Sequence, residues 1–316
     1  MNNTLVLYES NSNTTRKAAE IISFIVGNSK LLDVENSPNS IDKYSNIVIA
    51  IPLLGKKTGD KTIKYLEKHN FDFTNKKLIV VCVGLSKKDG IQYSTQIQNI
   101  TKKANIYYHF IHEELVLSKL TQEDKSSIKN FSEIINVPFK DMGEFKDTEA
   151  VKAAINIKKY IDRQQKTVPK IEMKKSIDQF IKKHNTATIA TGYENFIRAT
   201  PIEYEYKDNV FYFISEGGLK YVGILQNKNI SITIYEEYTG MDNLRGLQIT
   251  GNCQMIDTYS EEYEEIINLK KLNLEYIKKL PITLNIFKVI PIKYEYLNSN
   301  FKKNGYDARQ ILDCID

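Results

Sequence analysis

The groups best suited to chemistry in this 316-residue chain gather between Thr188 and Gly251. The turn at residues 215–220 reads SEGGLK. Its two glycines let the backbone pass close to a ligand, and Ser215 and Lys220 add a hydroxyl and an ammonium. A phosphate dianion requires donors and cations of this kind. The turn therefore indicates a site for an anionic ligand.

Further cations and donors come from neighbouring segments. Arg198 lies on a β-rich run, Arg245 lies just before another, and Gln248 lies within that second run. A planar redox ring needs apolar walls and a few placed donors, which these runs also offer. No residue stands out as a general acid or nucleophile, and Tyr193 and Tyr221 are the available proton donors.

The elements that must position these residues are mainly strands. Runs rich in Ile, Val, Phe, Tyr and Thr predict strands at Ile197–Tyr206, Val210–Ser215 and Ile230–Tyr235. Asp208-Asn209 predicts a tight hairpin between the first two. The other elements expected in this half are helices at 171–184, 221–227 and 261–280 and a strand at 247–250. Residues 284–296 predict a last strand pair or a bent strand, with an edge or bulge at Pro291, and residues 305–316 a tail.

The segments RATP, FYFISEGGLK and NLRGLQITG occur in this order and resemble the pyridoxamine-phosphate-oxidase-like FMN-binding split barrels. The resemblance covers roughly the second half of the chain. It implies that Arg198, Ser215 and Lys220 hold the phosphate and ribityl end of FMN. It also implies that main chain at Ala199 and Thr200 faces the isoalloxazine ring.

In the same family Arg245 and Gln248 would approach the flavin, often across a dimer interface, so the resemblance implies a homodimer. Glu203 departs from the basic residue usual in true pyridoxamine phosphate oxidases, which argues against that activity. The alternative for this half is an ordinary antiparallel barrel with solvated charges.

The first half opens with an apolar strand at Thr4–Tyr8, a loop reading SNSNTT at 10–15, and a helix at 16–26. Loop N–H groups and a helix N-terminus that face one point form an anion site. The candidate binding residues in this loop are Ser10, Ser12, Asn13, Thr14 and Thr15.

Strands expected at 47–51, 78–83 and 106–111 alternate with helices at 60–69 and 94–103. This alternation predicts a doubly wound parallel sheet, an α/β fold that binds ligands at the carboxyl ends of its strands. Further helices are expected at 121–137 and 149–161.

This half resembles flavodoxin, and in particular the flavodoxin-like domain of bacterial protoporphyrinogen oxidase. The family's phosphate loop is usually [ST]-x-T-G-N-T. Here Asn13 replaces the glycine, and asparagine is the next best residue for a left-handed backbone. Leu53 and Leu54 stand where an aromatic commonly stacks on flavin, and Tyr93 is the one aromatic of the third loop. Two alternatives stay open: a second FMN, or a scaffold that has lost its flavin and serves for docking.

These patterns divide the chain into a flavodoxin-like domain at 1–161, a linker at 162–170 and a split-barrel domain at 171–316. Net charge +5 is spread over many lysines, which permits anionic ligands and gives no basic block for nucleic acid. No apolar run is long enough to span a bilayer and no signal-peptide pattern is present, so we expect a cytoplasmic protein.

A metal site is not expected from the histidines or the cysteines. The three cysteines show no C-x-x-C spacing, so neither a disulfide framework nor a cysteine metal site is indicated. His109 and His112 would point to opposite faces of a strand.

The two resemblances together imply a flavin-dependent oxidoreductase that transfers electrons between its halves. NAD(P)H or a reduced electron carrier would be the donor. Both families include proteins that handle tetrapyrroles, which implies haem or a haem-derived tetrapyrrole as a substrate or ligand. The alternatives are a non-catalytic flavin- or haem-binding carrier or sensor, and a general flavin or nitro-type reductase.

Overall fold

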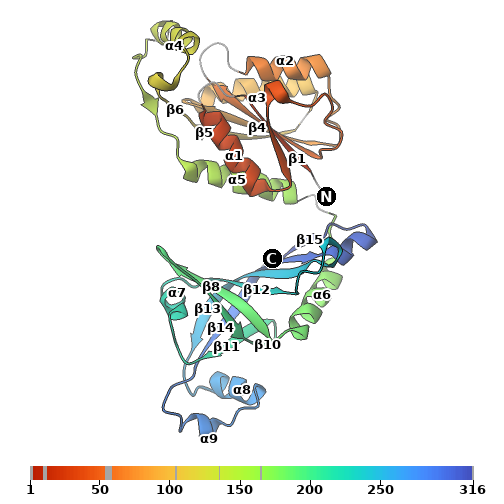
Figure 1. Ribbon diagram of the computed structural model, residues 1–316, viewed down its shortest axis with the longest axis vertical. Coiled ribbons are helices and arrows are strands. Elements are labelled where there is room, and N and C mark those ends of the chain that lie inside the picture. The colour runs from red at the N-terminus through yellow and green to blue at the C-terminus, as the bar shows by residue number, and fades with distance from the viewer. Residues whose placement is uncertain are drawn as a thin grey trace. The chain divides into compact units, whose positions relative to one another are not determined.

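The computed structural model describes residues 3–9, 13–53, 59–103, 105–134, 136–163 and 166–314. The chain folds into two compact units, Met1–Gln164 and Gln165–Asp316, shown in Figure 1. We refer to them as the N-terminal and the C-terminal unit.

The N-terminal unit is built on a parallel sheet with the strand order β2-β1-β3-β4-β5. Its elements are β1 Thr4–Tyr8, α1 Thr14–Val26, β2 Ser29–Asp33, β3 Asn46–Leu53, α2 Asp60–His69, β4 Lys77–Gly84, α3 Lys87–Thr101, β5 Ile106–His112, β6 Glu114–Leu115, α4 Gln122–Ile134, β7 Met142–Gly143 and α5 Asp147–Asp162.

Apolar side chains on both faces of this sheet explain why helices cover both. On one face Ile22 of α1 and Ile157 of α5 pack against Val81. On the other face Leu66 of α2 and Ile97 of α3 pack in a second cluster. The predicted doubly wound α/β architecture is therefore confirmed.

Two features of this unit differ from the expectation. Strand β2 was not foreseen because SKLLD is short, lies at the sheet edge and is only partly buried. Helix α3 begins at Lys87 rather than near Ser94. Tyr93 therefore lies within α3 and packs against an apolar cluster, so it is not a loop residue.

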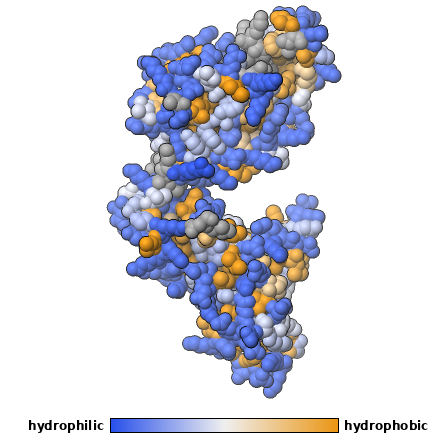
Figure 2. Space-filling model, turned by 180° about the vertical axis from the view of Figure 1, so that it is seen from behind, coloured by the Kyte–Doolittle hydropathy of each residue, from blue (hydrophilic) through white to orange (hydrophobic). Residues whose placement is uncertain are grey.

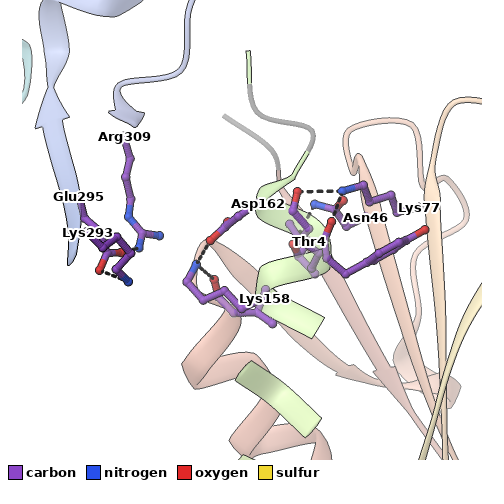
Figure 3. A network of polar contacts seen from close by, with 11 residues as sticks. Thr4, Asn46, Lys77, Lys158, Asp162, Lys293, Glu295 and Arg309 are labelled. Atoms are coloured by element: carbon purple, nitrogen blue, oxygen red, sulfur yellow. Dashed lines mark hydrogen bonds and ion pairs between the residues drawn. The ribbon is translucent and has the colours of Figure 1, made fainter. Parts of the chain in front are cut away.

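The end of α5 is fixed by Lys77, a buried residue at the start of β4 (Figure 3). Its ammonium donates to the carbonyls of Tyr160 and, at 2.8 Å, of Ile161. It also lies 4.8 Å from the centre of the Tyr160 ring. A cation at the C-terminus of a helix satisfies carbonyls that have no partner within the helix.

The C-terminal unit is a curled antiparallel half-barrel with the strand order β10-β11-β14-β13-β12-β8-β9, and β15 pairs with β14. Its elements are α6 Lys170–Lys183, β8 Thr186–Tyr193, β9 Phe196–Glu203, β10 Glu205–Lys207, β11 Val210–Ser215, α7 Lys220–Gln226, β12 Asn229–Tyr235, β13 Arg245–Ile256, α8 Glu261–Leu269, α9 Leu274–Ile277, β14 Asn285–Asn298 and β15 Arg309–Asp313.

The hairpin at Asp208-Asn209 is confirmed, and both residues have positive φ, as a tight two-residue turn between β10 and β11 requires. The single strand expected at Ile197–Tyr206 is wrong. It breaks at Tyr204, whose hydroxyl donates to the carbonyls of Ile181 and His184. Before the break β9 pairs with β8, and after it β10 pairs with β11.

The bent strand with a bulge is confirmed, because the register between β13 and β14 shifts beside Pro291. The long helix expected at 261–280 is wrong. Lys271 takes a left-handed conformation and ends the first helical segment, and Asn273 caps α9. The tail expected at 305–316 is also wrong, since Arg309–Asp313 forms β15 on the edge of β14.

Candidate functional site

The turn after β11 is shaped by Ser215 and two glycines. The Ser215 hydroxyl accepts from the N–H of Gly217 at 3.1 Å and donates to its carbonyl at 3.2 Å. Gly217 and Gly218 have φ values of 128° and 105°, which L side chains rarely adopt. The turn therefore presents glycine backbone that carries no Cβ, and the Ser215 hydroxyl holds Gly217 in place.

Lys220 is the first residue of α7, and it is buried, with 8% of its surface exposed. Its ammonium donates to the carbonyl of Gly217 and lies 5.3 Å from the centre of the Tyr221 ring. Burial lowers the pKa of Lys220, the charge of Arg198 lowers it further, and Glu216 opposes them. Two cations thus share one electrostatic environment, which an anion would stabilise.

Strands β8 and β9 place hydroxyls at the same site. Thr191 is paired with Arg198, and Ile189 is paired with Thr200. Arg198 and Thr200 therefore lie on one face of β9, and Ala199 between them lies on the other. In the described part of the chain the buried hydroxyls of Thr191 and Thr200 have no hydrogen-bond partner. Unpaired buried hydroxyls are costly, so this arrangement fits a bound polar ligand.

Helix α7 approaches β8 closely because residue 223 is glycine. A Cβ at Gly223 would lie 2.6 Å from the nitrogen of Gly192 and 2.7 Å from Cβ of Thr191. The approach brings Lys220 and Ser215 toward the strand pair that carries Arg198. Sequence reasoning missed Thr191 and Gly223, because neither belongs to a recognisable motif.

The two tyrosines named as proton donors lie in different surroundings. Burial raises the pKa of Tyr221, and the Ser215 hydroxyl lowers it by less. The Tyr221 hydroxyl therefore stays protonated inside the site. Tyr193 is 41% exposed near the tip of the β8–β9 hairpin.

Arg245 begins β13, and Gln248 lies three residues further along, on the other face of the strand. Arg245 forms an ion pair with Glu236 at 3.7 Å, and Glu236 also pairs with Lys183 at 2.6 Å. Gln248 is exposed and lines a depression of about 340 Å³ together with Thr233, Tyr235, Glu295 and Arg309. Figure 3 shows Glu295 between Lys293 and Arg309, which bind it as ion pairs.

Within one chain the structure does not bring these two sets together. Ser215 is paired with Asn285 and Arg245 with Asn298, at the two ends of β14. At roughly 3.3 Å per residue, the intervening strand is about 40 Å long before curvature. Arg245 and Gln248 therefore do not reach the Lys220 turn of their own chain.

In the N-terminal unit the expected anion loop is described in part. Ser10 and Ser12 lie outside the described residues, as does Leu54. Asn13 precedes α1 with φ 67°, which is the left-handed conformation expected of it. The Thr14 hydroxyl donates to the carbonyl of Glu114 at 3.4 Å, and the buried hydroxyl of Thr15 has no hydrogen-bond partner in the described ranges.

Glu9 is a further residue at this edge, and no sequence motif points to it. It is 2% exposed and follows β1. Its carboxylate accepts from the N–H and the hydroxyl of Thr62, both at 2.9 Å. Thr62 is in the first turn of α2, so an internal carboxylate already occupies that helix N-terminus.

No group of three His, Cys, Asp or Glu residues in the described ranges is arranged to hold a metal ion. His112 instead pairs with Glu149 at 2.9 Å. Every helix in the part of the chain that the structure describes is too short or too polar to cross a bilayer.

Residues 173–296 match the family model described as Pyridoxamine 5'-phosphate oxidase. The predicted resemblance of the second half is therefore confirmed over these residues. The flavodoxin resemblance of the N-terminal unit stays a prediction. Comparison with curated proteins finds no match.

The solved structures that are similar to the chain include three described here, all at low sequence identity. HutZ from Vibrio cholerae, a haem storage protein, is 14% identical over 37% of this chain and 87% of that one, with a TM-score of 0.32. ChuZ from Campylobacter jejuni is 12% identical over 56% of this chain and 74% of its own, with a TM-score of 0.37. A FAD-binding protein from Mesorhizobium loti is 12% identical over 38% of this chain and 89% of its own, with a TM-score of 0.31. At these values the likenesses carry no inference about ligand or activity.

Proposed function

We propose that the C-terminal unit binds FMN and that the chain is a flavin-dependent oxidoreductase. The observation that carries this proposal is the buried Lys220, whose charge is close enough to Arg198 to feel it. A glycine turn and the buried hydroxyls of Thr191 and Thr200 lie next to it, and the described residues offer these hydroxyls no hydrogen-bond partner. The match of residues 173–296 to the oxidase family supports it. The flavin would supply the hydride or one-electron chemistry.

In this proposal each residue has a defined part. Arg198, Ser215 and Lys220 hold the phosphate and the ribityl chain, since two cations and a hydroxyl suit a dianion. Main chain at Ala199 and Thr200 faces the ring. Exclusion of water by the apolar inner face of the half-barrel would strengthen these interactions.

Arg245 and Gln248 would serve the flavin of a second copy, because β13 carries them away from the Ser215 turn of their own chain. A homodimer follows from this assignment. Figure 2 shows apolar areas at the surface of the C-terminal unit, and Ile197 and Leu225 are exposed by 82% and 67%. Such residues are suited to an interface between copies.

The N-terminal unit would be a flavodoxin-type module that exchanges electrons with the split barrel. Its strand order β2-β1-β3-β4-β5 is that of flavodoxin, and Asn13, Thr14 and Thr15 lie at the carboxyl edge where such sheets bind FMN. It would carry a second FMN or serve for docking. NAD(P)H or a reduced carrier would be the donor.

Haem or a haem-derived tetrapyrrole is the substrate class we propose for this redox centre, on the resemblance of both halves to tetrapyrrole-handling families. A carrier or sensor without catalysis is the second candidate. It is favoured by the lack of a recognisable acid–base set around Lys220 in the described residues, where Tyr221 is the protonated group.

The first experiment counts flavin released per chain in the purified protein. Wild type should hold at least one FMN, and Lys220→Met should hold little. Lys228→Met, which changes an exposed lysine next to β12, is the matched control and should keep its flavin. A wild-type chain that neither holds nor takes up FMN would overturn the proposal.

A second experiment separates oxidoreductase from carrier. NAD(P)H or a reduced flavodoxin-type donor is added without oxygen, and the flavin absorbance is followed. Bleaching followed by recovery when a tetrapyrrole is added supports the enzyme. Binding of haem with no change in flavin redox state would favour the carrier, and recovery with nitro compounds or free flavin alone would indicate a general reductase.

A further inference from the structure

Thr191 is a buried hydroxyl residue whose type is not explained by packing. It is 3% exposed, on the buried face of β8 that also carries Ala187 and Ile189. Valine has nearly the same shape, is equally suited to a strand and brings no hydroxyl to bury. The oxygen of a threonine at this position therefore needs a polar partner.

The described part of the chain does not supply that partner. Among those residues the Thr191 hydroxyl is enclosed and forms no hydrogen bond. A buried hydroxyl left unpaired costs free energy, and buried polar groups in native proteins are nearly always satisfied by protein, water or ligand. The hydroxyl is thus suited to a hydrogen bond with a bound molecule.

Two cations lie around this hydroxyl. Thr191 pairs with Arg198 across β8 and β9, and directly opposed residues have Cβ atoms about 5 Å apart on one face. Helix α7 packs beside β8 (Figure 1), and a Cβ at Gly223 would lie 2.7 Å from Cβ of Thr191. Lys220 lies one helical turn before Gly223 and is buried on the same side of α7.

We propose that Thr191 binds the phosphate of the ligand, next to Arg198 and Lys220. Strand β8, strand β9 and helix α7 then supply one donor group each. A phosphate can accept from all three at once, because it offers three oxygens that are strong acceptors. The inference rests on the proposed flavin site for the choice of FMN, and it adds a residue that distinguishes phosphorylated ligands from others.

A role in binding and a role in folding predict different effects of Thr191→Val, which keeps the shape of the side chain and removes the hydroxyl. In flavin-free protein the urea midpoint should stay unchanged or rise, because no hydrogen bond within the described residues is lost. A lower midpoint would show that the hydroxyl has a partner inside the folded chain, and it would overturn the proposal.

Affinity for two flavins shows which part of the ligand meets the hydroxyl. Binding to the C-terminal unit is taken as the part that Lys220→Met lacks. Thr191→Val should raise the Kd for FMN about 10- to 100-fold, as expected for one lost hydrogen bond to a charged group. Riboflavin has no phosphate, so its Kd should change by less than about threefold. An equal loss for both flavins, or an unchanged Kd for FMN, would contradict the assignment.

Thr188→Val is the matched control. Thr188 lies three residues before Thr191 in the same strand, so its side chain takes the other face. This variant loses the same hydroxyl group and should bind FMN as wild type does. Thr191→Ser keeps a hydroxyl and should recover most of the affinity. If Thr188→Val weakened FMN binding as much as Thr191→Val, the effect would not come from the site.

Inorganic phosphate separates this inference from the proposed function. In excess it should raise the melting temperature of wild type and of Thr188→Val, and should raise that of Thr191→Val by less, because a ligand stabilises the state that binds it. If phosphate gave this pattern and FMN did not bind, the flavin proposal would fail and the role of Thr191 would stand. If FMN bound wild type and Thr191→Val equally well, the inference alone would fail.

Discussion

At the scale of single residues, the buried lysine of the glycine turn is the most informative group. Lys220 has its pKa lowered mainly by burial, so the site holds a charge under conditions that disfavour it. A bound phosphate would compensate that cost. This is a physical reason for the residue to be lysine, beyond its place in a motif.

Affinity for FMN should therefore fall as pH rises through the lowered pKa of Lys220, because the neutral amine no longer attracts phosphate. The decline should be at most about tenfold per pH unit. Lys220→Arg keeps its charge at all these pH values and should remove the decline. The measurement is the Kd for FMN against pH, and identical profiles for the two proteins would contradict the assigned role.

Lys77 offers a test of stability against pH. Its pKa is lowered, so its effect has the opposite sign to that of a lysine whose pKa is raised by an ion pair. Burial lowers its pKa from 10.5 to about 8. Between these values the unfolded chain binds more protons than the folded chain, so the free energy of unfolding rises with pH. Relative to Lys77→Met, wild type should gain about 1–3 kcal/mol across this window, allowing for solvent screening.

This gain is measured by urea denaturation of both proteins at pH 8 and above pH 10, following the transition of the N-terminal unit. Below pH 8 the difference between the two proteins should stay constant, since Lys77 is then charged in both states. A difference that shrinks as pH rises would show that Lys77 is stabilised in its charged form.

At the scale of elements, the close packing of α7 against β8 determines whether the Lys220 site can form. Gly223→Ala should lower the free energy of unfolding by about 1–3 kcal/mol, because the new Cβ meets the backbone of Gly192. It should also reduce flavin content, since α7 carries Lys220. The intrinsic helix preference favours alanine, so the predicted sign is opposite to that of an exposed helix position.

Gln226→Ala in the same helix is the control. Gln226 is exposed and polar, so its truncation should change stability by less than about 0.5 kcal/mol and leave the flavin bound. If Gly223→Ala retained full flavin content and stability, the close approach of α7 would not matter to the site.

At the scale of the whole molecule, the distance between Lys220 and Arg245 along the sheet predicts sites shared between chains. Lys220→Met and Arg245→Ala homodimers should each lose flavin. A mixed dimer would contain one intact site and one site lacking both residues. A random mixture of the two variants should therefore recover about a quarter of the wild-type flavin.

Flavin per chain, measured after co-expression of the two variants, tests this. The control is co-expression of Lys220→Met with wild type, which should give half of the wild-type flavin however the chains pair, because Arg245 is intact in both chains. No recovery in the first mixture, or a flavin-loaded wild type that sediments as a monomer, would show that each site is built within one chain.

Much of the fold could be predicted from local signals. The apolar runs of the first half predicted three of the buried parallel strands closely, and Asp208-Asn209 predicted its turn, because both signals arise from neighbours in sequence. Strand β2 and the end of the chain at β15 gave weaker signals. Their backbones become strands only because an edge of β1 or of β14 is available for pairing.

The sequence by itself determined the chemistry present: a glycine turn with Ser215 and Lys220, cations at Arg198 and Arg245, and hydroxyls near the first helix. Only the tertiary structure decided which of these meet. Arg198 lies near Lys220 because β9 and α7 both pack on β8. Arg245 lies at the start of β13, away from that turn. The reason is that local periodicity fixes which face a side chain takes, while long-range pairing fixes its neighbours.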